Sequence, residues 1–432
     1  MATVPKASQL ARPAAEVRRI AQLAEAPALV EAQRWFIRER SWINELHLQL
    51  CRIPAPTFFE QERAEWFRRQ LEDLNWRSTI DRAGNVLAAF GAEQAPRRII
   101  VSAHLDTVFS PTRPEEVYFA PDGRLVGPGT SDNGSGLAAM LALARLLGGD
   151  SELHDLASSI LLVANVGEEG EGNLSGMRYL CEGLGGQSSV GLRSIRSFLV
   201  LDGPSIEHVT AQALASKRYE ITFSGAGGHS WNDHGTPNPV HVLSHLISGF
   251  VQSADARFLE HRRTQCAYNF SVVEGGNSIN SIPANARAKL DIRSEDPALL
   301  DELSALLTAT VERSLEHGNR GAKSSRLSAK IRDLGSRPGG KLPADSSLLR
   351  TVLAVDAHLN IRSRVDCAST DANVPLSLGL AAISIGAGGS GGGAHTRGEW
   401  YQPEGRELGL RRIFLLLVSL LDQDGELRRA EA

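Results

Sequence analysis

The chain has 432 residues, of which 42% are hydrophobic and 22% charged, with a formal net charge of −4. This length predicts two domains, because a single hydrophobic core rarely organises so long a chain. The composition is that of a globular protein, and its charge gives no indication of binding to nucleic acid or to an anionic membrane. Cys51, Cys181, Cys266 and Cys367 lie far apart, so reduced, mostly buried thiols are expected rather than disulfide bonds.

The first 20 residues contain no uninterrupted apolar segment of the kind that a secretory signal requires, and no window is long enough for a membrane span. Together with the cysteines, this predicts a cytoplasmic protein. Residues 1–14 are expected to form a loose tail. Residues 15–51 and 59–74 have helical periodicity, with Leu23, Trp35, Ile37, Trp42, Ile43 and Leu46 as the apolar anchors of the earlier stretch.

Nearly continuous apolar runs then predict buried parallel strands in RRIIVSAHLD and SSILLVANVG. Between them SGLAAMLALARLLGG predicts a helix that ends at glycine. This strand–helix–strand order is typical of an α/β sheet. Further along, LAAISIGAG predicts another strand, and the last predicted element is the helix ELGLRRIFLLLVSLL.

The pattern changes after Asp202, where strand–helix–strand–strand–helix signals follow one another. This order predicts a separate α+β domain at residues 216–333, inserted into a discontinuous domain made of residues 1–215 and 334–432. The segment RPGGKLPADS marks the return to the larger domain.

Imidazole and carboxylate side chains follow several of the apolar runs or lie in glycine-rich turns. In open α/β sheets, ligands bind at such strand ends. Two imidazoles and several carboxylates suit two divalent metal ions, with zinc as the first candidate. The candidate residues are His104 and Asp106 in VSAHLDTVF, Asp132 in GTSDNGSG, Glu168 and Glu169 after LLVANVG, Asp202 after SFLVL, and His395 after GAGGSGGGA.

Each motif also has a structural explanation. A lone histidine near a strand is most often a structural residue, Asp132 is well suited to cap a helix, with Asn133 and Ser135 as alternative caps, and Glu168 and Glu169 suit a solvated turn. The apolar strand before the two glutamates argues against that last explanation. The glycine-rich run before His395 is not a phosphate-binding loop, because no Lys–Ser/Thr pair follows it.

The ordered set from His104 to His395 resembles the zinc peptidases and deacylases of the M20 group, which include peptidase T-like aminopeptidases, carboxypeptidases, desuccinylases and acetylornithine deacetylases. The resemblance extends roughly from Leu46 to the last helix. It implies a zinc-peptidase-like α/β catalytic domain with a mixed central sheet flanked by helices, and an inserted α+β lid that also pairs two subunits. Asp132 would bridge two Zn²⁺ ions, with Co²⁺ or Mn²⁺ as alternative metals. His104 and Asp202 would complete one ion, and Glu169 and His395 the other.

The catalytic roles follow the same resemblance. Glu168 would be the general base that deprotonates water, and Asp106 would fix the His104 tautomer, a role that hydrogen-bonded neighbours of metal ligands commonly have. His229 in SGAGGHSW would polarise the scissile carbonyl, in its own subunit or in a partner's. Asn280 in NSINSIP and Arg293 in LDIRS would hold the substrate's carbonyl or carboxylate, with a lid salt bridge as the alternative role of Arg293.

The expected function is that of a cocatalytic dizinc hydrolase that cleaves an amide bond in a small substrate. The segment STDANVPLSLGLAAISIG resembles peptidase T-like members, which makes a di- or tripeptide with a free N-terminus the first expected substrate class. The alternatives are an N-acyl amino acid deacylase or a carboxypeptidase of the same group. A catalytically silent homologue that acts as a binding protein belongs to a different class, and retention of all the ligands argues against it.

Overall fold

The computed structural model describes residues 14–92, 99–149, 151–185, 195–260, 264–322 and 325–422. It forms two compact units: a main unit of residues 14–213 and 341–422, and an inserted unit, Leu214–Gly340. Each has its own hydrophobic core. The tail predicted at residues 1–14 lies outside the described residues except for Ala14, where helix α1 begins.

The main unit is built on a mixed nine-stranded sheet with the order β1-β2-β6-β3-β7-β17-β8-β15, in which β16 also pairs with β8. At its centre β3 pairs in parallel with β6 and β7, and β7 with β17, whereas β1, β2 and β6 are joined by antiparallel pairs. The predicted parallel strands and mixed sheet are therefore confirmed. The strands are β1 (Arg77–Ile80), β2 (Val86–Ala89), β3 (Ile99–His104), β6 (Ile160–Asn165), β7 (Ser197–Leu201), β8 (His208–Ala213), β15 (Gly340–Lys341), β16 (Arg364–Ala368) and β17 (Ala382–Ile385).

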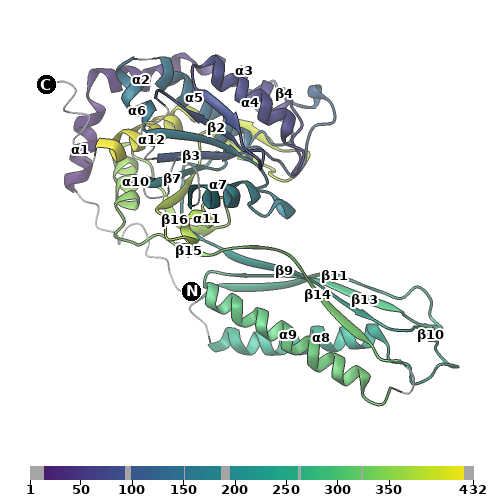
Figure 1. Cartoon of the computed structure of the whole chain (residues 1–432). Coiled ribbons are helices and arrows are strands. Elements are labelled where there is room, and N and C mark those ends of the chain that lie inside the picture. Colours follow the sequence, from purple (N-terminus) through teal and green to yellow (C-terminus); the bar gives the residue numbers. More distant parts are fainter. Residues whose placement is uncertain are drawn as a thin grey trace. The chain divides into compact units, whose positions relative to one another are not determined.

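Helices flank this sheet (Figure 1). The most apolar of them, α5, is almost wholly buried and packs against β3, as the run of leucine and alanine in its sequence requires. The predicted helical stretch before residue 51 forms three helices instead of one. The helices are α1 (Ala14–Ala24), α2 (Pro27–Arg38), α3 (Arg40–Cys51), α4 (Gln61–Asp73), α5 (Gly134–Gly149), α6 (His154–Ser158), α7 (Ser175–Gly185), α10 (Ser347–His358), α11 (Asn373–Ser377) and α12 (Arg406–Leu421).

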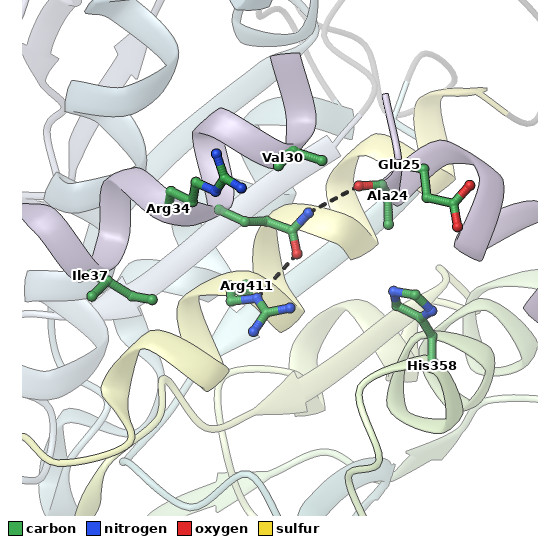
Figure 2. Close-up of a pocket in the computed structure, with 8 residues that line it drawn as sticks. Ala24, Glu25, Val30, Arg34, Ile37, His358 and Arg411 are labelled. Carbon is green, nitrogen blue, oxygen red and sulfur yellow. Dashed lines mark hydrogen bonds between the residues drawn. The ribbon is translucent and has the colours of Figure 1, made fainter. Parts of the chain in front are cut away.

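A buried amide ties the early helices to the last one. Gln33 on α2 donates to the carbonyl oxygens of Leu29 and Ala24, at 3.1 and 3.4 Å, and accepts from Nε of Arg411 on α12 at 3.1 Å. Figure 2 shows Ala24, Arg411 and His358 around an open pocket of about 320 Å³. The contacts anchor the N-terminal helices to α12.

A second, four-stranded sheet of the main unit has the order β18-β19-β5-β4. It joins the glycine-rich run and the segment after His395 to the loop before α5, because β19 pairs with both β18 and β5. The strands are β4 (Tyr118–Phe119), β5 (Leu125–Val126), β18 (Ser390–Gly392) and β19 (Trp400–Gln402).

The inserted unit has a four-stranded antiparallel sheet with the order β11-β13-β9-β14, packed against α8 and α9 (Figure 1). A short β10–β12 pair extends from it. The boundary predicted at residue 333 falls inside β14, because β14 pairs with β9 along its length and carries the unit to Gly340. The elements are β9 (Ala215–Ser224), β10 (Gly228–His229), α8 (Pro239–Glu260), β11 (Cys266–Gly275), β12 (Ser281–Ile282), β13 (Asn285–Ser294), α9 (Pro297–Asn319) and β14 (Ser328–Arg337).

All four cysteines are free, and Cys51 and Cys181 are buried. Among the described residues, no helix combines the length and the apolar character needed to cross a membrane.

Candidate metal centre

The centre begins at the carboxyl end of β3. Nδ1 of His104 lies 3.0 Å from the carbonyl oxygen of Asp106, which accepts a hydrogen bond from the Nδ1–H group and leaves Nε2 free to bind a cation. The Asp106 carboxylate lies 3.4 Å from the same Nδ1. Both side chains are buried. The imidazole is therefore held in the tautomer that a metal ligand needs, although the backbone of Asp106 is the nearer partner.

Asp132 lies in the turn before α5. Oδ1 of its neighbour Asn133 accepts from the Gly136 amide at 3.2 Å, so Asn133 caps the helix and the Asp132 carboxylate is left for other contacts. Asn133 also donates to the Leu201 carbonyl at 2.8 Å, which fixes this turn to the end of β7. The peptide bond between Asp132 and Asn133 is cis.

A glutamate far along the chain holds the Asp132 loop. Oε1 of Glu399 accepts from the amides of Ser131 and Asp132, at 2.8 and 2.7 Å, and Oε2 accepts from that of Gly129 at 2.7 Å. Glu399 is only 3% exposed. Three amides on one buried carboxylate define the backbone of the segment that presents Asp132.

Glu168 and Glu169 follow β6 and are both buried. Their amides donate to the Asp106 carboxylate, at 3.0 and 2.9 Å, and the Gly167 amide donates to Glu60 at 3.1 Å. Asp106 thus connects the end of β3 to the segment that carries the two glutamates. It positions three candidate functional residues, and not His104 alone.

Asp202 and His395 complete the set. Asp202 directly follows β7, and His395 follows the glycine-rich run with φ of 60°, a left-handed conformation that histidine seldom adopts. A Cβ atom at Gly391 would lie 2.3 Å from the Ser131 hydroxyl oxygen, so glycine is needed for this run to approach the Asp132 loop.

These side chains converge on Asp132. Nε2 of His104 lies 3.1 Å from Oδ1 of Asp132, and Nε2 of His395 lies 3.1 Å from Oδ2. Glu169 lies 2.8 Å from Nε2 of His395, and Asp202 lies 4.0 Å from Nε2 of His104. The possible ligand atoms fall into groups within 4.8 Å of one another: His104, Asp132 and Asp202; Asp132, Glu169 and His395; and His104, Glu168 and Glu169. The two oxygens of Asp132 therefore face two different donor sets.

The pKa values of the clustered carboxylates and imidazoles are shifted from their usual values by burial and by one another. Burial raises the pKa of Glu169 to about 7, and burial with the nearby Asp132 raises that of Asp202 well above its usual value. Burial lowers the pKa of His104, but Asp106 and Asp132 outweigh burial and raise it. Hydrogen bonding to Asp132 raises the pKa of His395 to about 9. Glu169 and Asp202 thus resist ionisation while the adjacent imidazoles hold protons, and a bound cation would offset the carboxylate charge.

The donor chemistry fits a divalent metal. Imidazole nitrogens and carboxylate oxygens in groups of three suit Zn²⁺ and its neighbours in the first transition row. Such an ion would replace the protons that the imidazoles otherwise carry and would neutralise the buried carboxylates.

The three candidates in the inserted unit do not form one group. His229 on β10 pairs in register with Ser281, next to Asn280, whose carbonyl accepts from the Ser230 amide at 3.0 Å. Arg293 lies near the opposite end of β13, in register with Ser216, and forms an ion pair with Asp291 at 2.7 Å. The salt bridge considered as the alternative role of Arg293 is thus present.

Several positioning residues escaped the sequence analysis: Glu399, Glu60, Thr57 and Asp371. Thr57 donates to the Asp106 carboxylate at 3.0 Å. Asp371 is fully buried and accepts from Asn165, at the end of β6, at 2.7 Å. Burial and the nearby Glu168 raise the pKa of Asp371 to about 7. The only sequence signals were the acidic residues in HTRGEW and STDANVP, whose partners lie far away along the chain.

Comparison with known proteins identifies relatives of this chain. A succinyl-diaminopimelate desuccinylase of Corynebacterium glutamicum is 26% identical over 344 residues, which cover 79% of this chain and 86% of the relative. The cytosol non-specific dipeptidase of Escherichia coli is 25% identical over 284 residues, covering 60% of this chain and 55% of the relative. Among solved structures, a tripeptidase from Staphylococcus aureus has a TM-score of 0.68 at 15% identity, covering 88% of this chain and 98% of that one.

The family match and the named relatives define a metal-dependent hydrolase, and the similar solved structure shows the same mixed α/β fold. The chain belongs to peptidase family M20/M25/M40, whose family profile matches residues 100–418.

Proposed function

We propose that the protein is a dinuclear hydrolase that cleaves an amide bond in a small substrate, with a di- or tripeptide as the first substrate class. The observation that supports it most directly is the position of Asp132, each of whose oxygens lies 3.1 Å from a different imidazole nitrogen. A carboxylate in this arrangement suits a bridge between two divalent ions, with zinc as our first choice.

The proposed chemistry assigns one role to each side chain. His104, Asp132 and Asp202 would hold one ion, and Asp132, Glu169 and His395 would hold the other. A metal ion bound there would supply Lewis acidity toward the scissile carbonyl and would lower the pKa of water. Glu168 takes the proton from the attacking water and returns it to the leaving amine, as a general base and then a general acid. The backbone amide of Glu168 donates to the Asp106 carboxylate at 3.0 Å, and this hydrogen bond positions Glu168.

His229 is our candidate for contacting the scissile carbonyl. The amides of Trp231 and Asn232 donate to its Nδ1, at 3.2 and 3.3 Å, so the ring proton is on Nε2. An exposed Nε2–H is the donor that such a contact needs. Following the resemblance, Asn280 and Arg293 are candidates for holding the substrate's carbonyl or carboxylate, and the inserted unit for pairing two subunits in a homodimer.

The second candidate function is hydrolysis of an N-acyl amino acid, supported by the coverage of the C. glutamicum desuccinylase relative. A carboxypeptidase of the same group is a further alternative. A silent homologue is disfavoured, because the ligand groups and Glu168 are all present. The name of the E. coli relative, a cytosol dipeptidase, supports the cytoplasmic location that we also propose.

The test is a panel of di- and tripeptides, N-acetyl and N-succinyl amino acids, and peptides with a blocked N-terminus, assayed with zinc-loaded protein. We expect amide hydrolysis that a chelator abolishes, and elemental analysis giving two metal ions per chain. Cleavage of N-blocked peptides alone would support the carboxypeptidase. Cleavage of acyl amino acids alone would support the deacylase. Fully loaded protein that cleaves nothing in the panel would support the silent homologue.

A further inference from the structure

An exposed apolar surface lies beside the metal centre. Four side chains in two short segments form it: Phe58, Phe59, Val108 and Phe109, which we call the apolar rim. Their exposed fractions are 62, 74, 42 and 40%. Single exposed apolar residues are ordinary, but a group next to a reactive centre indicates a surface that is covered when a ligand is bound.

Hydrogen bonds hold the two segments of the rim together and join them to the centre. The Thr107 amide donates to the Ala55 carbonyl at 2.9 Å, and the Ala55 amide donates to the Ser110 hydroxyl at 3.1 Å. The Thr57 hydroxyl donates to the Asp106 carboxylate at 3.0 Å. The rim is therefore attached to the residue that positions His104 and Glu168.

Two further features tie the rim to this place. Phe58 has φ of 76°, a conformation that is costly for a bulky side chain and that the surrounding contacts must maintain. The guanidinium of Arg397, two residues after His395, lies over the Phe109 ring at 5.9 Å. The rim thus adjoins the β3 end on one side and the loop carrying His395 on the other.

We propose that the apolar rim binds a large aliphatic or aromatic group of the substrate close to the scissile amide. This inference rests on the proposed hydrolysis and narrows its substrate class to peptides or N-acyl amino acids with an apolar side chain. Covering three phenyl rings and a valine with apolar atoms is favourable, whereas a charged dicarboxylic acyl group such as succinyl would gain nothing there and would lose hydration.

The inference is tested with substrates matched in shape. Leucine and asparagine have similar size, so zinc-loaded protein is assayed with Leu-Ala and Asn-Ala, Ala-Leu and Ala-Asn, and N-acetyl-leucine and N-acetyl-asparagine. We expect kcat/KM for the leucine member of the preferred pair to exceed that of the asparagine member by about tenfold or more, the range in which apolar pockets discriminate.

Variants locate the source of the preference. Phe59→Ala and Phe109→Ala, singly and combined, are expected to reduce the leucine-to-asparagine ratio, and the double variant to bring it close to one. Ile37→Ala is the matched control, because Ile37 is 52% exposed but lies on α2, outside the rim. Thermal midpoints verify that each variant is folded.

The outcomes separate the two proposals. Hydrolysis of the panel with equal rates for leucine and asparagine members overturns the rim inference and leaves the proposed function standing. A strong leucine preference that survives the double variant also overturns it, because the preference then arises elsewhere. No hydrolysis of any amide overturns the proposed function, and this inference with it.

Discussion

Glu168 is the side chain on which the proposed reaction most depends. It is buried beside His104 and Glu169, but the two donor sets that include Asp132 are complete without it. Glu168→Gln keeps the shape and removes the base, so turnover should fall by about 10²–10⁴-fold, the usual contribution of proton transfer. Metal content, measured by elemental analysis, should stay near that of the unmodified protein. Near-full activity in this variant would place the base elsewhere, with Glu171 as the next candidate.

Glu399 should control metal affinity without touching the metal. An amide in its place cannot accept from the three backbone amides of Gly129, Ser131 and Asp132, because one of its two positions becomes a donor. Glu399→Gln should therefore weaken metal binding by about 10–100-fold, as is typical when a partner that orients a ligand is removed.

Competition titration with a zinc chelator measures this loss. The matched control is Glu404→Gln, which lies in the turn after β19 and has an exposed side chain. A Glu399→Gln protein with unchanged zinc affinity and a lowered thermal midpoint would show that Glu399 serves stability alone.

Among single residues, the sequence predicted those whose neighbouring sequence indicates their chemistry. It missed those whose role depends on partners far away along the chain. His104 is the last residue of β3 and Glu168 lies shortly beyond β6, and apolar runs in the sequence predict both strands. Glu399 acquires its role only when β19 pairs with β5 and brings it to the loop before α5. The neighbouring residues HTRGEW contain no pattern that predicts this strand pairing.

Among the elements, α5 depends on a close approach at its first turn. A Cβ atom at Gly136 would lie 2.4 Å from the Asn133 side-chain oxygen and 2.8 Å from the Leu201 carbonyl oxygen. Gly136→Ala must displace the cap or the end of β7, and should destabilise the protein by about 1–3 kcal/mol. Because the Asp132 turn would move with the helix, metal affinity should fall as well.

The same helix supplies the control. A Cβ atom at Gly149, the last residue of α5, would meet no neighbouring atom within 4 Å, so Gly149→Ala should be neutral or slightly stabilising. Denaturant unfolding of both variants measures the difference. Equal free energies of unfolding for the two variants would mean that the start of α5 can shift at little cost. Asp132 would then be held in place by other contacts.

Elements with a strong apolar pattern were predicted, and weakly patterned ones were not. The continuous runs of β3 and β6 identified a buried parallel pair, and the structure confirms it. In contrast, β14 contains Lys330, Arg332 and Asp333 and has many exposed residues, so its sequence resembles a loop. Its strand conformation comes from pairing with β9, which explains why the predicted domain boundary fell inside it.

For the whole molecule, the two cores predict separable folding units. The chain leaves the main unit after β8 and returns at β15, and these strands are neighbours in the sheet, with the Leu342 amide donating to the Ala211 carbonyl at 2.9 Å. Replacing residues 214–340 by a short turn should therefore leave a folded main unit that binds metal, since the proposed ligands lie outside that segment. It should be inactive, because His229, Asn280 and Arg293 are absent.

Elemental analysis and the peptide assay test both expectations on the shortened protein. Full hydrolysis would show that the inserted unit is dispensable for the reaction. Loss of folding would show that the two cores are interdependent, and a second variant that keeps β9 and β14 joined by a turn would then measure how much of the inserted sheet the main unit needs.

The last prediction concerns whether His229 acts within its own chain or in a partner's site. If the protein is a twofold dimer with His229 contributed across the interface, Glu168→Gln and His229→Ala chains complement each other. In a mixed dimer, the site with an intact Glu168 receives an intact His229 from the other chain, whereas the second site has both lesions. Random exchange makes about half of the dimers mixed, so roughly a quarter of all sites should work. If His229 acts within its own chain, every site keeps one lesion and mixing restores nothing. The measurement is hydrolysis before and after subunit exchange, with each variant alone as the baseline, and a fully active monomer in solution would also exclude the cross-subunit role.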